Sequence, residues 1–394
     1  MLKQLGLIFN FTEKKGYFCR QGINYRQSFM YMIKGLKKSN IEVACELLKH
    51  AVAVFLSVVF IVVVVSCQND KDKEPEYEML ATEYQNELFS IVTLNVDGLP
   101  ARIGNLPIEI NPEGPGAEYS PLIGEYLASK GYDFIAVQED FNYNEEIITG
   151  LGTGYCSDVW SGGLSMDRIG PGLKFPFDGV NGFWKKELAV KRADSVAWTM
   201  NYGKFDHAAD DLITKGFRRY DIQLKGSSRL VVYNMHLDAS DEDDEIKGND
   251  GPDRKARMTQ WRQLRDYIIR HIDKRPVIVT GDLNSYYSRD SIRSVFMDYI
   301  EEKANAQVND AWVVLQRGGE YPELQSAPVL PDGNGWMYKG EGVDKIIYIN
   351  PAAGGKLVPV TVDIDTINYL RSDGTPIGDH FPLSATFRLT RSEQ

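Results

Sequence analysis

The stretch PVIVTGDLNSYYS, Pro276 to Ser288, begins as a buried strand and ends in polar residues. Its β-branched run predicts a strand that is covered on both faces. Gly281 then permits a tight turn or the close approach of another group, and Asp282 and Asn284 share one face if the extended path continues. An isolated GDLN sequence is equally typical of an Asx turn after a strand, so the rest of the chain has to decide.

Composition indicates a globular protein whose main part is acidic. The chain has 394 residues, 43% of them hydrophobic and 25% charged, which suits one large domain with an appendage, or two domains. Residues 1–66 hold 9 Lys+Arg and 3 Asp+Glu, whereas the remainder holds 35 and 52. A domain with so negative a charge binds polyanions poorly unless a metal or a local basic groove compensates.

The apolar run AVAVFLSVVFIVVVVS, residues 51–66, has the length of a secretory hydrophobic region and is short for a bilayer span. Four lysines precede it, and VVSC resembles the lipobox of bacterial lipoproteins, in which Cys67 is lipidated after cleavage. We therefore expect an export signal over 1–66, a flexible tether over 67–87 and a domain over 88–394, anchored in the bacterial cell envelope as an outer-membrane lipoprotein. An uncleaved anchor helix is the alternative, and the true start codon could lie at Met30 or Met32.

Cysteine usage predicts that disulfides do not hold the mature domain together. The chain has four cysteines, and two of them lie in the predicted signal region. Cleavage would leave Cys67 and Cys156, and lipidation of Cys67 would leave Cys156 without a cysteine to form a disulfide with.

From about residue 88, apolar strand-like runs alternate with helical patterns, and no internal repeat is visible. Residues 254–272 carry a helical apolar stripe, and SPLIGEYLASKG predicts a helix with Ser120 as N-cap, Pro121 at its first position and Gly131 at its end. This alternation predicts a layered α/β domain. The predicted strands are 88–95, 133–139, 229–236, 276–282, 343–349 and 382–389.

Polar side chains suited to metal or phosphate gather where these strands begin or end. Any one of them is more often structural than functional, but their recurrence at the edges of a sheet predicts a site. Glu139 is a hard oxygen ligand of the kind that Mg²⁺ prefers, and Asp282 can orient or deprotonate water. The residues concerned are Asn95, Asp97, Glu139, Asn234, His236, Asp238, Asp282, Asn284, Asp344, Asp379 and His380.

The motifs LNVDGLP, VQED, YNMHLDA, GDLNS, VDKIIY and GDHFPL resemble, in this order, those of the endonuclease/exonuclease/phosphatase superfamily. The resemblance covers about residues 88–389. It implies a deoxyribonuclease I-like fold, in which two mixed β-sheets and flanking helices form a four-layered sandwich, and it implies metal-dependent hydrolysis of phosphoesters.

The resemblance also assigns roles. Glu139 would be the main metal ligand, with Asn95, Asp97 and Asp379 beside it, Mg²⁺ as the ion and Mn²⁺ or Ca²⁺ as alternatives. Asp282 and Asn284 would act on water and phosphate, and Asn234 and Asp238 would contact substrate. His236 and His380 are two of five histidines, and both have acidic neighbours in sequence, so we expect a carboxylate to raise the pKa of each. Asp344 is expected to hold His380.

His236 distinguishes branches of the superfamily, because the abasic-site endonucleases lack a histidine there. YNMHLDA, KGFRRYDIQL and DRKARMTQWRQL resemble the secreted sphingomyelinase-type phosphodiesterases. The expected protein is a monomeric, membrane-anchored hydrolase that cleaves a phospholipid headgroup diester. An extracellular endonuclease acting on nucleic acid, a sugar or inositol phosphate phosphatase, and a non-catalytic binding protein remain as alternatives.

Two further segments bear on the substrate. KFPFDGVNGFW, Lys174 to Trp184, would suit a membrane surface if its aromatic side chains were exposed, and would be structural if they were buried. DEDDE, Asp241 to Glu245, is typical of a solvated loop, and would repel a polyanionic strand if it lay near the site.

Overall fold

Each of the six predicted runs forms a strand. The computed structural model describes residues 86–102, 110–203, 207–240, 251–326 and 340–391, all within the compact unit Ala81–Gln394. The predicted signal region, most of the tether, Cys67 and the DEDDE segment lie outside the described residues. Among the residues described, no helix combines the length and the apolar character that crossing a bilayer requires.

The first sheet has the strand order β11-β12-β1-β2-β4-β3. β1 and β2 are parallel, so their carboxyl ends, Asn95 and Gln138, are partners in register, and the other neighbours are antiparallel. The bounds are β1 (Glu87–Asn95), β2 (Phe134–Gln138), β3 (Tyr155–Ser157), β4 (Asn181–Lys185), β11 (Gly355–Ile364) and β12 (Leu383–Arg391).

The second sheet has the order β5-β6-β7-β8-β10-β9. Its one parallel pair, among the described strands, is β7 with β8, which aligns His236 with Asp282, and the antiparallel β10 aligns Asp344 with Asp282 on the other side. The bounds are β5 (Ala189–Ala197), β6 (Gly216–Gln223), β7 (Arg229–His236), β8 (Val277–Asp282), β9 (Ala306–Asp310) and β10 (Asp344–Pro351).

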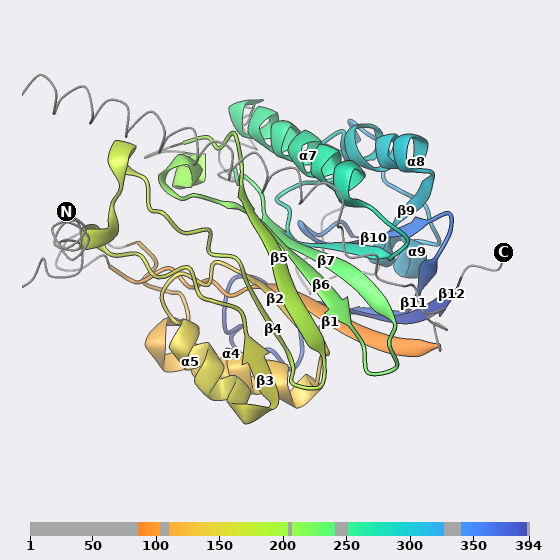
Figure 1. Ribbon diagram of the computed structural model, residues 1–394. Coiled ribbons are helices and arrows are strands. Elements are labelled where there is room, and N and C mark those ends of the chain that lie inside the picture. Colours follow the sequence, from red (N-terminus) through yellow and green to blue (C-terminus); the bar gives the residue numbers. More distant parts are fainter. Residues whose placement is uncertain (1–85, 103–109, 204–206, 241–250, 327–339, 392–394) are drawn as a thin grey trace, which may run out of the picture. The chain divides into compact units, whose positions relative to one another are not determined.

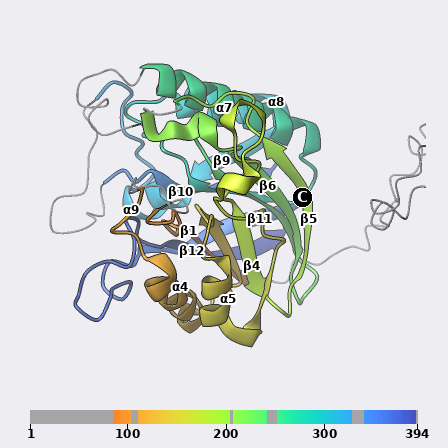
Figure 2. The same ribbon diagram turned by 90° about the vertical axis from the view of Figure 1, so that its left-hand side faces the viewer.

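Helices cover the outer face of each sheet. α4 (Gly116–Lys130) and α5 (Asn144–Leu151) lie against the first sheet, whereas α7 (Gly251–His271) and α8 (Asp298–Ala304) lie against the second, as Figures 1 and 2 show. α9 (Ala311–Gln316) follows β9 and contacts β10 and β11. The remaining elements are short turns at Gly152–Gly154, Met166–Arg168, Pro171–Leu173, His207–Leu212 and Arg293–Met297.

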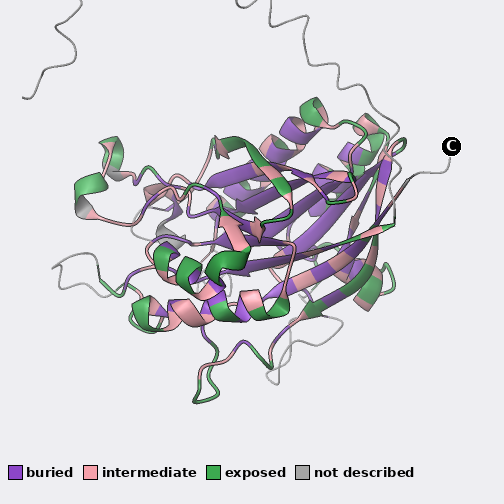
Figure 3. Cartoon of the chain, turned by 60° about the horizontal axis from the view of Figure 1, so that its bottom comes forward, coloured by how far each residue is buried: buried purple, intermediate pink, exposed green. Residues whose placement is uncertain are grey.

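The helices and the two sheets form four layers, and three clusters of apolar side chains lie between them. The central one lies between the sheets and includes Phe89, Phe134 and Phe387, all fully buried. Figure 3 shows the strands buried along most of their length while the outward faces of the helices remain exposed. Burial of each large apolar side chain contributes about 1.5–3 kcal/mol, so the inner faces of both sheets fix the sandwich. The predicted four-layered α/β architecture with two mixed sheets is confirmed.

One local prediction is wrong, and one question that the sequence left open is resolved. The first helix begins one turn earlier than expected, because Pro115 and Gly116, which has a φ of 56°, start it, and the Ser120 hydroxyl donates to the Gly116 carbonyl inside the helix. Gly131 ends the helix in the left-handed conformation, as predicted. For the aromatic segment 174–184 the buried, structural alternative holds, since Phe175, Phe177 and Phe183 are all at most 5% exposed.

Candidate active site

The polar ends of the strands meet at one edge of the sandwich, around the carboxylate of Asp282. Its Oδ2 atom lies 3.1 Å from Asn95 Nδ2, which joins the first sheet to the second. His236 Nε2 is 3.4 Å away and His380 Nε2 is 3.7 Å away. Asp282 is 2% exposed, so these polar neighbours take the place of water around a buried charge. The GDLNS motif therefore ends in a site and not in a simple surface turn.

Gly281 explains how β8 approaches its neighbour so closely at this point. Its φ is 146°, and a Cβ at this position would lie 1.9 Å from the carbonyl oxygen of Met235 in β7. Asp97, Glu139 and Asn284 have φ angles of 50°, 55° and 44°, in the left-handed region that non-glycine residues avoid. Three predicted site residues thus share a costly backbone conformation, which is typical of functional positions.

His380 is held as the sequence predicts. Its Nδ1 atom is 2.7 Å from Asp344 Oδ2, which leaves Nε2 directed towards Asp282. Burial on its own would lower the pKa of His380, but the carboxylates of Asp344 and Asp282 outweigh it and raise that pKa well above 6.5. His380 is therefore a cation at neutral pH, which forms a hydrogen bond to Asp344 through Nδ1 and an ion pair with Asp282 through Nε2.

His236 differs from the expectation. Burial and the ammonium group of Lys215 lower its pKa to about 3, although Asp282 acts in the opposite direction. Lys215 Nζ lies 3.1 Å from His236 Nε2, closer than either neighbouring carboxylate. Because an ammonium group can only donate, Nε2 accepts and the ring proton is on Nδ1. The expected carboxylate-raised pKa is wrong for this histidine, which is neutral.

Lys215 is the site residue that the sequence analysis missed. It precedes β6, is 4% exposed and forms an ion pair with the buried Asp210. Burial lowers its pKa, but Asp210 and Glu139 together raise it above the usual value, so the side chain remains charged. The available signal was the position of Lys215 at the start of KGFRRYDIQL, whose RRYDIQ part is a sheet strand.

Four of the predicted residues line one side of the site, here called the metal edge: Asn95, Asp97, Glu139 and Asp379. Burial and the charge of Asp379 raise the pKa of Asp97 to about 6. Burial likewise raises the pKa of Glu139 to about 7, with Asp379 and Asp282 adding to the effect and Lys215 opposing it. Three carboxylates that repel one another, with an amide beside them, are hard oxygen donors that fit a divalent cation.

A second metal-competent group lies beside the metal edge. Asp282, Asp344 and His380 place ligand atoms within 4.8 Å of one another. In this trio, however, the charge of His380 already compensates the two acids. The metal edge has no such internal cation among the described residues, so it is the side of the site with the greater demand for a metal ion.

Two predicted substrate contacts, Asn234 and Asp238, are corrected. Asn234 is fully buried, and its amide is bonded to Gln138 and to two backbone carbonyls of the first sheet. Asp238 is also fully buried, and its carboxylate accepts from the Tyr202 N–H. Neither is brought to the site surface. Asn284 lies at the site, where its side chain donates to the Leu237 carbonyl and its N–H donates to Asp282.

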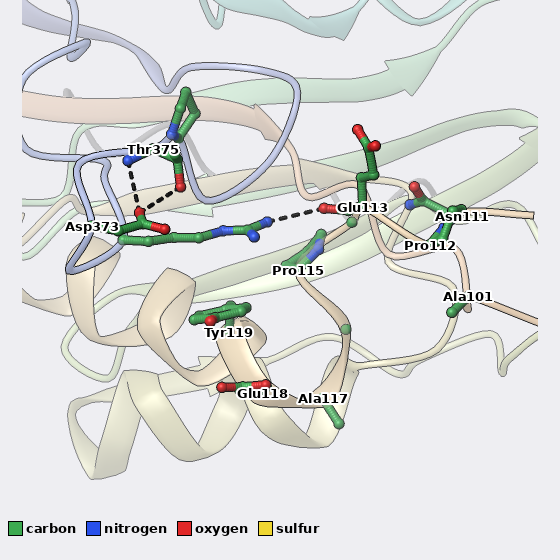
Figure 4. A pocket seen from close by; sticks show the side chains of 14 residues that line it. Ala101, Asn111, Pro112, Glu113, Pro115, Ala117, Glu118, Tyr119, Asp373 and Thr375 are labelled. Atoms are coloured by element: carbon green, nitrogen blue, oxygen red, sulfur yellow. Dashed lines mark hydrogen bonds between the residues drawn. The ribbon is translucent and has the colours of Figure 1, made fainter.

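A cavity of about 610 Å³ adjoins the metal edge, and Figure 4 shows its lining. Asn111 belongs to its wall and donates to Asp97 Oδ1 at 2.5 Å. Arg371 donates to the carbonyls of Glu113 and Ile377 and stacks on Tyr119 with 4.4 Å to the ring centroid. Its charge is outnumbered by the carboxylates that line the cavity, those of Glu113, Glu118 and Asp373.

With this geometry, the comparisons with known proteins can be interpreted. D. rerio TDP2, complexed with single-strand DNA product, superposes with a TM-score of 0.50 at 16% identity, over 76% of this chain and 99% of that one. An endonuclease/exonuclease/phosphatase protein from Bacteroides vulgatus gives a TM-score of 0.49 at 15% identity, over 77% and 99%. No protein-family model matches the chain. The domain has the deoxyribonuclease I-like fold of the endonuclease/exonuclease/phosphatase proteins, as the motif order predicted.

Sequence comparison places the chain more narrowly. Sphingomyelinases from Mycobacterium bovis and Mycobacterium tuberculosis are 30% identical to it over 308 residues, which are 76% of this chain and 52% of theirs. The chain spans about half the length of these curated relatives. The chain is similar in sequence to these sphingomyelinases over the shared part, which confirms the predicted resemblance.

Replacing Asp344 by Asn is expected to lower the pKa of His380, because the strongest carboxylate partner is lost while burial remains. In the wild type the raised pKa contributes stability that is complete below about pH 6.5 and is lost as the pH rises through the pKa of the folded state. NMR titration of the ring and unfolding at several pH values measure both effects. Asp298→Asn, an exposed change on α8, is the control. An unchanged His380 titration would contradict the pairing.

Replacing Lys215 by Met, with Asp210→Asn to avoid leaving a buried acid unpaired, is expected to raise the pKa of His236 from about 3. The pKa should stay below 6.5, since burial is the larger cause. NMR titration of His236 measures it, with Asp210→Asn alone as the matched control that keeps the ammonium group. Lys215→Met alone should cost about 3 kcal/mol of stability, because it leaves Asp210 buried without its cation. A His236 pKa that does not move would show that Lys215 does not set its charge.

Proposed function

We propose that this domain is a metal-dependent phosphodiesterase that hydrolyses a phospholipid headgroup diester of the sphingomyelin type. The bond that breaks joins phosphorus to the oxygen of the lipid alcohol, so the phosphorylated headgroup is released. One observation carries the proposal: a buried carboxylate, Asp282, lies between a neutral and a cationic histidine beside an acidic metal edge, in a chain similar in sequence to the sphingomyelinases. This arrangement supplies a base, a fixed positive charge and a metal position at one phosphate.

The residues divide the chemistry among them. Asp282 orients a water molecule and takes its proton as the water oxygen bonds to phosphorus and the bond to the alcohol oxygen breaks; the departing alkoxide takes a proton from solvent and leaves as the alcohol. His380, kept charged by Asp344, donates from Nε2 to a phosphate oxygen on which negative charge develops. His236 keeps its place through Lys215 and adds no charge of its own. Glu139 and Asp97 would hold the metal ion, and their oxygen donors favour Mg²⁺. When bound, the ion would further stabilise the negative charge on the phosphate.

Charge supports a zwitterionic headgroup over a nucleic acid strand. The cavity beside the metal edge carries three carboxylates against one guanidinium that is already engaged by carbonyl groups and Tyr119. Such a wall attracts a quaternary ammonium group and repels successive phosphates. The observation disfavours the endonuclease alternative, which the experiment below tests directly.

The domain from Ala81 to Gln394 should release phosphocholine from sphingomyelin vesicles in the presence of Mg²⁺, and chelation should abolish the release. Asp282→Ala and His380→Ala should each lower kcat by at least about 10²-fold, the contribution of a positioned acid or base. Asp298→Asn serves as the surface control. Cleavage of plasmid DNA without lipid turnover would move the protein to the nuclease branch. Release of phosphate from inositol phosphate alone would indicate a phosphatase. No turnover of any of the three substrates would favour the non-catalytic binding protein.

We also propose that the protein is exported and attached to the cell envelope by a lipid on Cys67, because the residue directly follows a signal-like apolar run and precedes a polar tether and an acidic domain. Metabolic labelling of producing cells with palmitate should label the wild type and not Cys67→Ser. The variant should also leave the membrane fraction. A labelled variant, or one that stays with the membrane, would favour the uncleaved anchor helix.

A further inference from the structure

One face of α7 is polar where it is most deeply buried. Arg257, Gln260 and Trp261 stand three and four residues apart, so they share a face of the helix, and each is 0% exposed. A helix packed on a sheet ordinarily buries apolar side chains on this face, and a buried guanidinium carries a large desolvation cost. The polar groups are therefore retained for the specific contacts that they make.

The first set of contacts reaches the segment that follows β7 and His236. Gln260 Oε1 accepts from the Asp238 N–H at 2.9 Å, and Arg257 Nη1 donates to the Asp238 carbonyl at 3.3 Å. The same guanidinium nitrogen donates to Ser240 Oγ at 2.7 Å. Both backbone groups of Asp238, two residues after His236, are thus bonded to side chains of α7.

The second set reaches the segment that follows β8 and Asp282. Trp261 Nε1 donates to Ser285 Oγ at 3.1 Å, one residue after Asn284. Arg257 Nε lies 3.3 Å from Asp290 Oδ2, whose other carboxylate oxygen is 3.4 Å from Arg254. Arg257 is therefore bonded to the segments after both strands at once, through two different nitrogens of its planar fork.

The opposite side of these segments faces the site. The Leu237 N–H donates to the Asp282 carbonyl at 3.0 Å, and Asn284 Nδ2 donates to the Leu237 carbonyl at 3.2 Å. The two segments thus form a thin polar layer, with the site on one side and α7 on the other. Figure 1 shows α7 lying along the second sheet beside β7. A shift of either segment would move His236 relative to Asp282 and Asn284.

We propose that Arg257 is a positioning residue that sets the spacing between the β7 segment, with His236, and the β8 segment, with Asp282 and Asn284. It acts through Asp238, Ser240 and Asp290 and touches none of the reacting groups. A guanidinium spans both segments, whereas an ammonium group at the same position can serve one of them. The activity readout of this inference rests on the proposed phosphodiesterase function.

The test compares Arg257→Lys and Arg257→Met with Arg254→Met in the domain from Ala81 to Gln394. Misplacement of reacting groups by about 1 Å costs on the order of 10²-fold in rate, so both Arg257 variants should lose between about 10-fold and 10²-fold in kcat for sphingomyelin vesicles. KM should stay within about twofold, because the metal edge and the cavity are unchanged. Arg254→Met removes an exposed partner of the same Asp290 and should keep the wild-type kcat.

A readout that does not need turnover accompanies the kinetics. Amide hydrogen exchange at residues 237–240 and 283–286 should accelerate in Arg257→Lys and stay unchanged in Arg254→Met, while exchange in the strands β7 and β8 stays slow in both. If wild type hydrolyses no phosphodiester, the proposed function fails, and this exchange pattern still decides the positioning role. Should Arg257→Met fail to fold, Arg257→Lys carries the test.

Three outcomes would overturn the proposal. The first is full kcat in Arg257→Lys with wild-type exchange in both segments. A second is a loss of kcat that a lower folded fraction, measured by the thermal unfolding transition, accounts for completely. The third is an equal loss of kcat in Arg254→Met, which would assign the effect to Asp290 alone.

Discussion

The buried carboxylate of Asp282 is the constraint on which the site depends. A charge at 2% exposure is stable only if its neighbours compensate it, and here they come from both sheets: Asn95 from the first, His236 from the second, and His380 from the loop before β12. The lowered pKa of Asp282, which these groups produce against the effect of burial, shows that the compensation succeeds. The same contacts that allow the charge to be buried also bring the strand ends together.

The two histidines illustrate how surroundings decide the charge of identical side chains. Both lie within 4 Å of Asp282, yet His380 is cationic because Asp344 adds a second carboxylate, and His236 is neutral because it is buried and because Lys215 supplies a positive charge next to its ring. The two histidines therefore leave one cationic and one neutral ring beside the anionic Asp282.

Much of the fold and part of the site could be predicted from the sequence. β-Branched runs located six strands, and polar residues at their ends located Asp282, His236, Asp344 and His380, because strand ends meet at a sheet edge. A period of two predicts the face on which a side chain lies but not its depth, so Asn234, two residues before His236, was wrongly placed at the surface of the site. Lys215 precedes a strand, Asn111 lies in a turn and Arg257 belongs to a helix. No local pattern links any of them to the strand ends that they contact.

The residues that sequence patterns missed share one physical task, which is to satisfy buried polar groups behind the reacting side chains. Lys215 compensates the charge of Asp210 and Glu139. Asn111 donates a hydrogen bond to Asp97. Arg257 donates to Asp290 and to the carbonyl of Asp238. Each such group costs more to leave unpaired than a lost apolar contact, and each bond is directional. The acids at the strand ends therefore require specific partners from distant parts of the chain, and meeting that requirement fixes the geometry of the site.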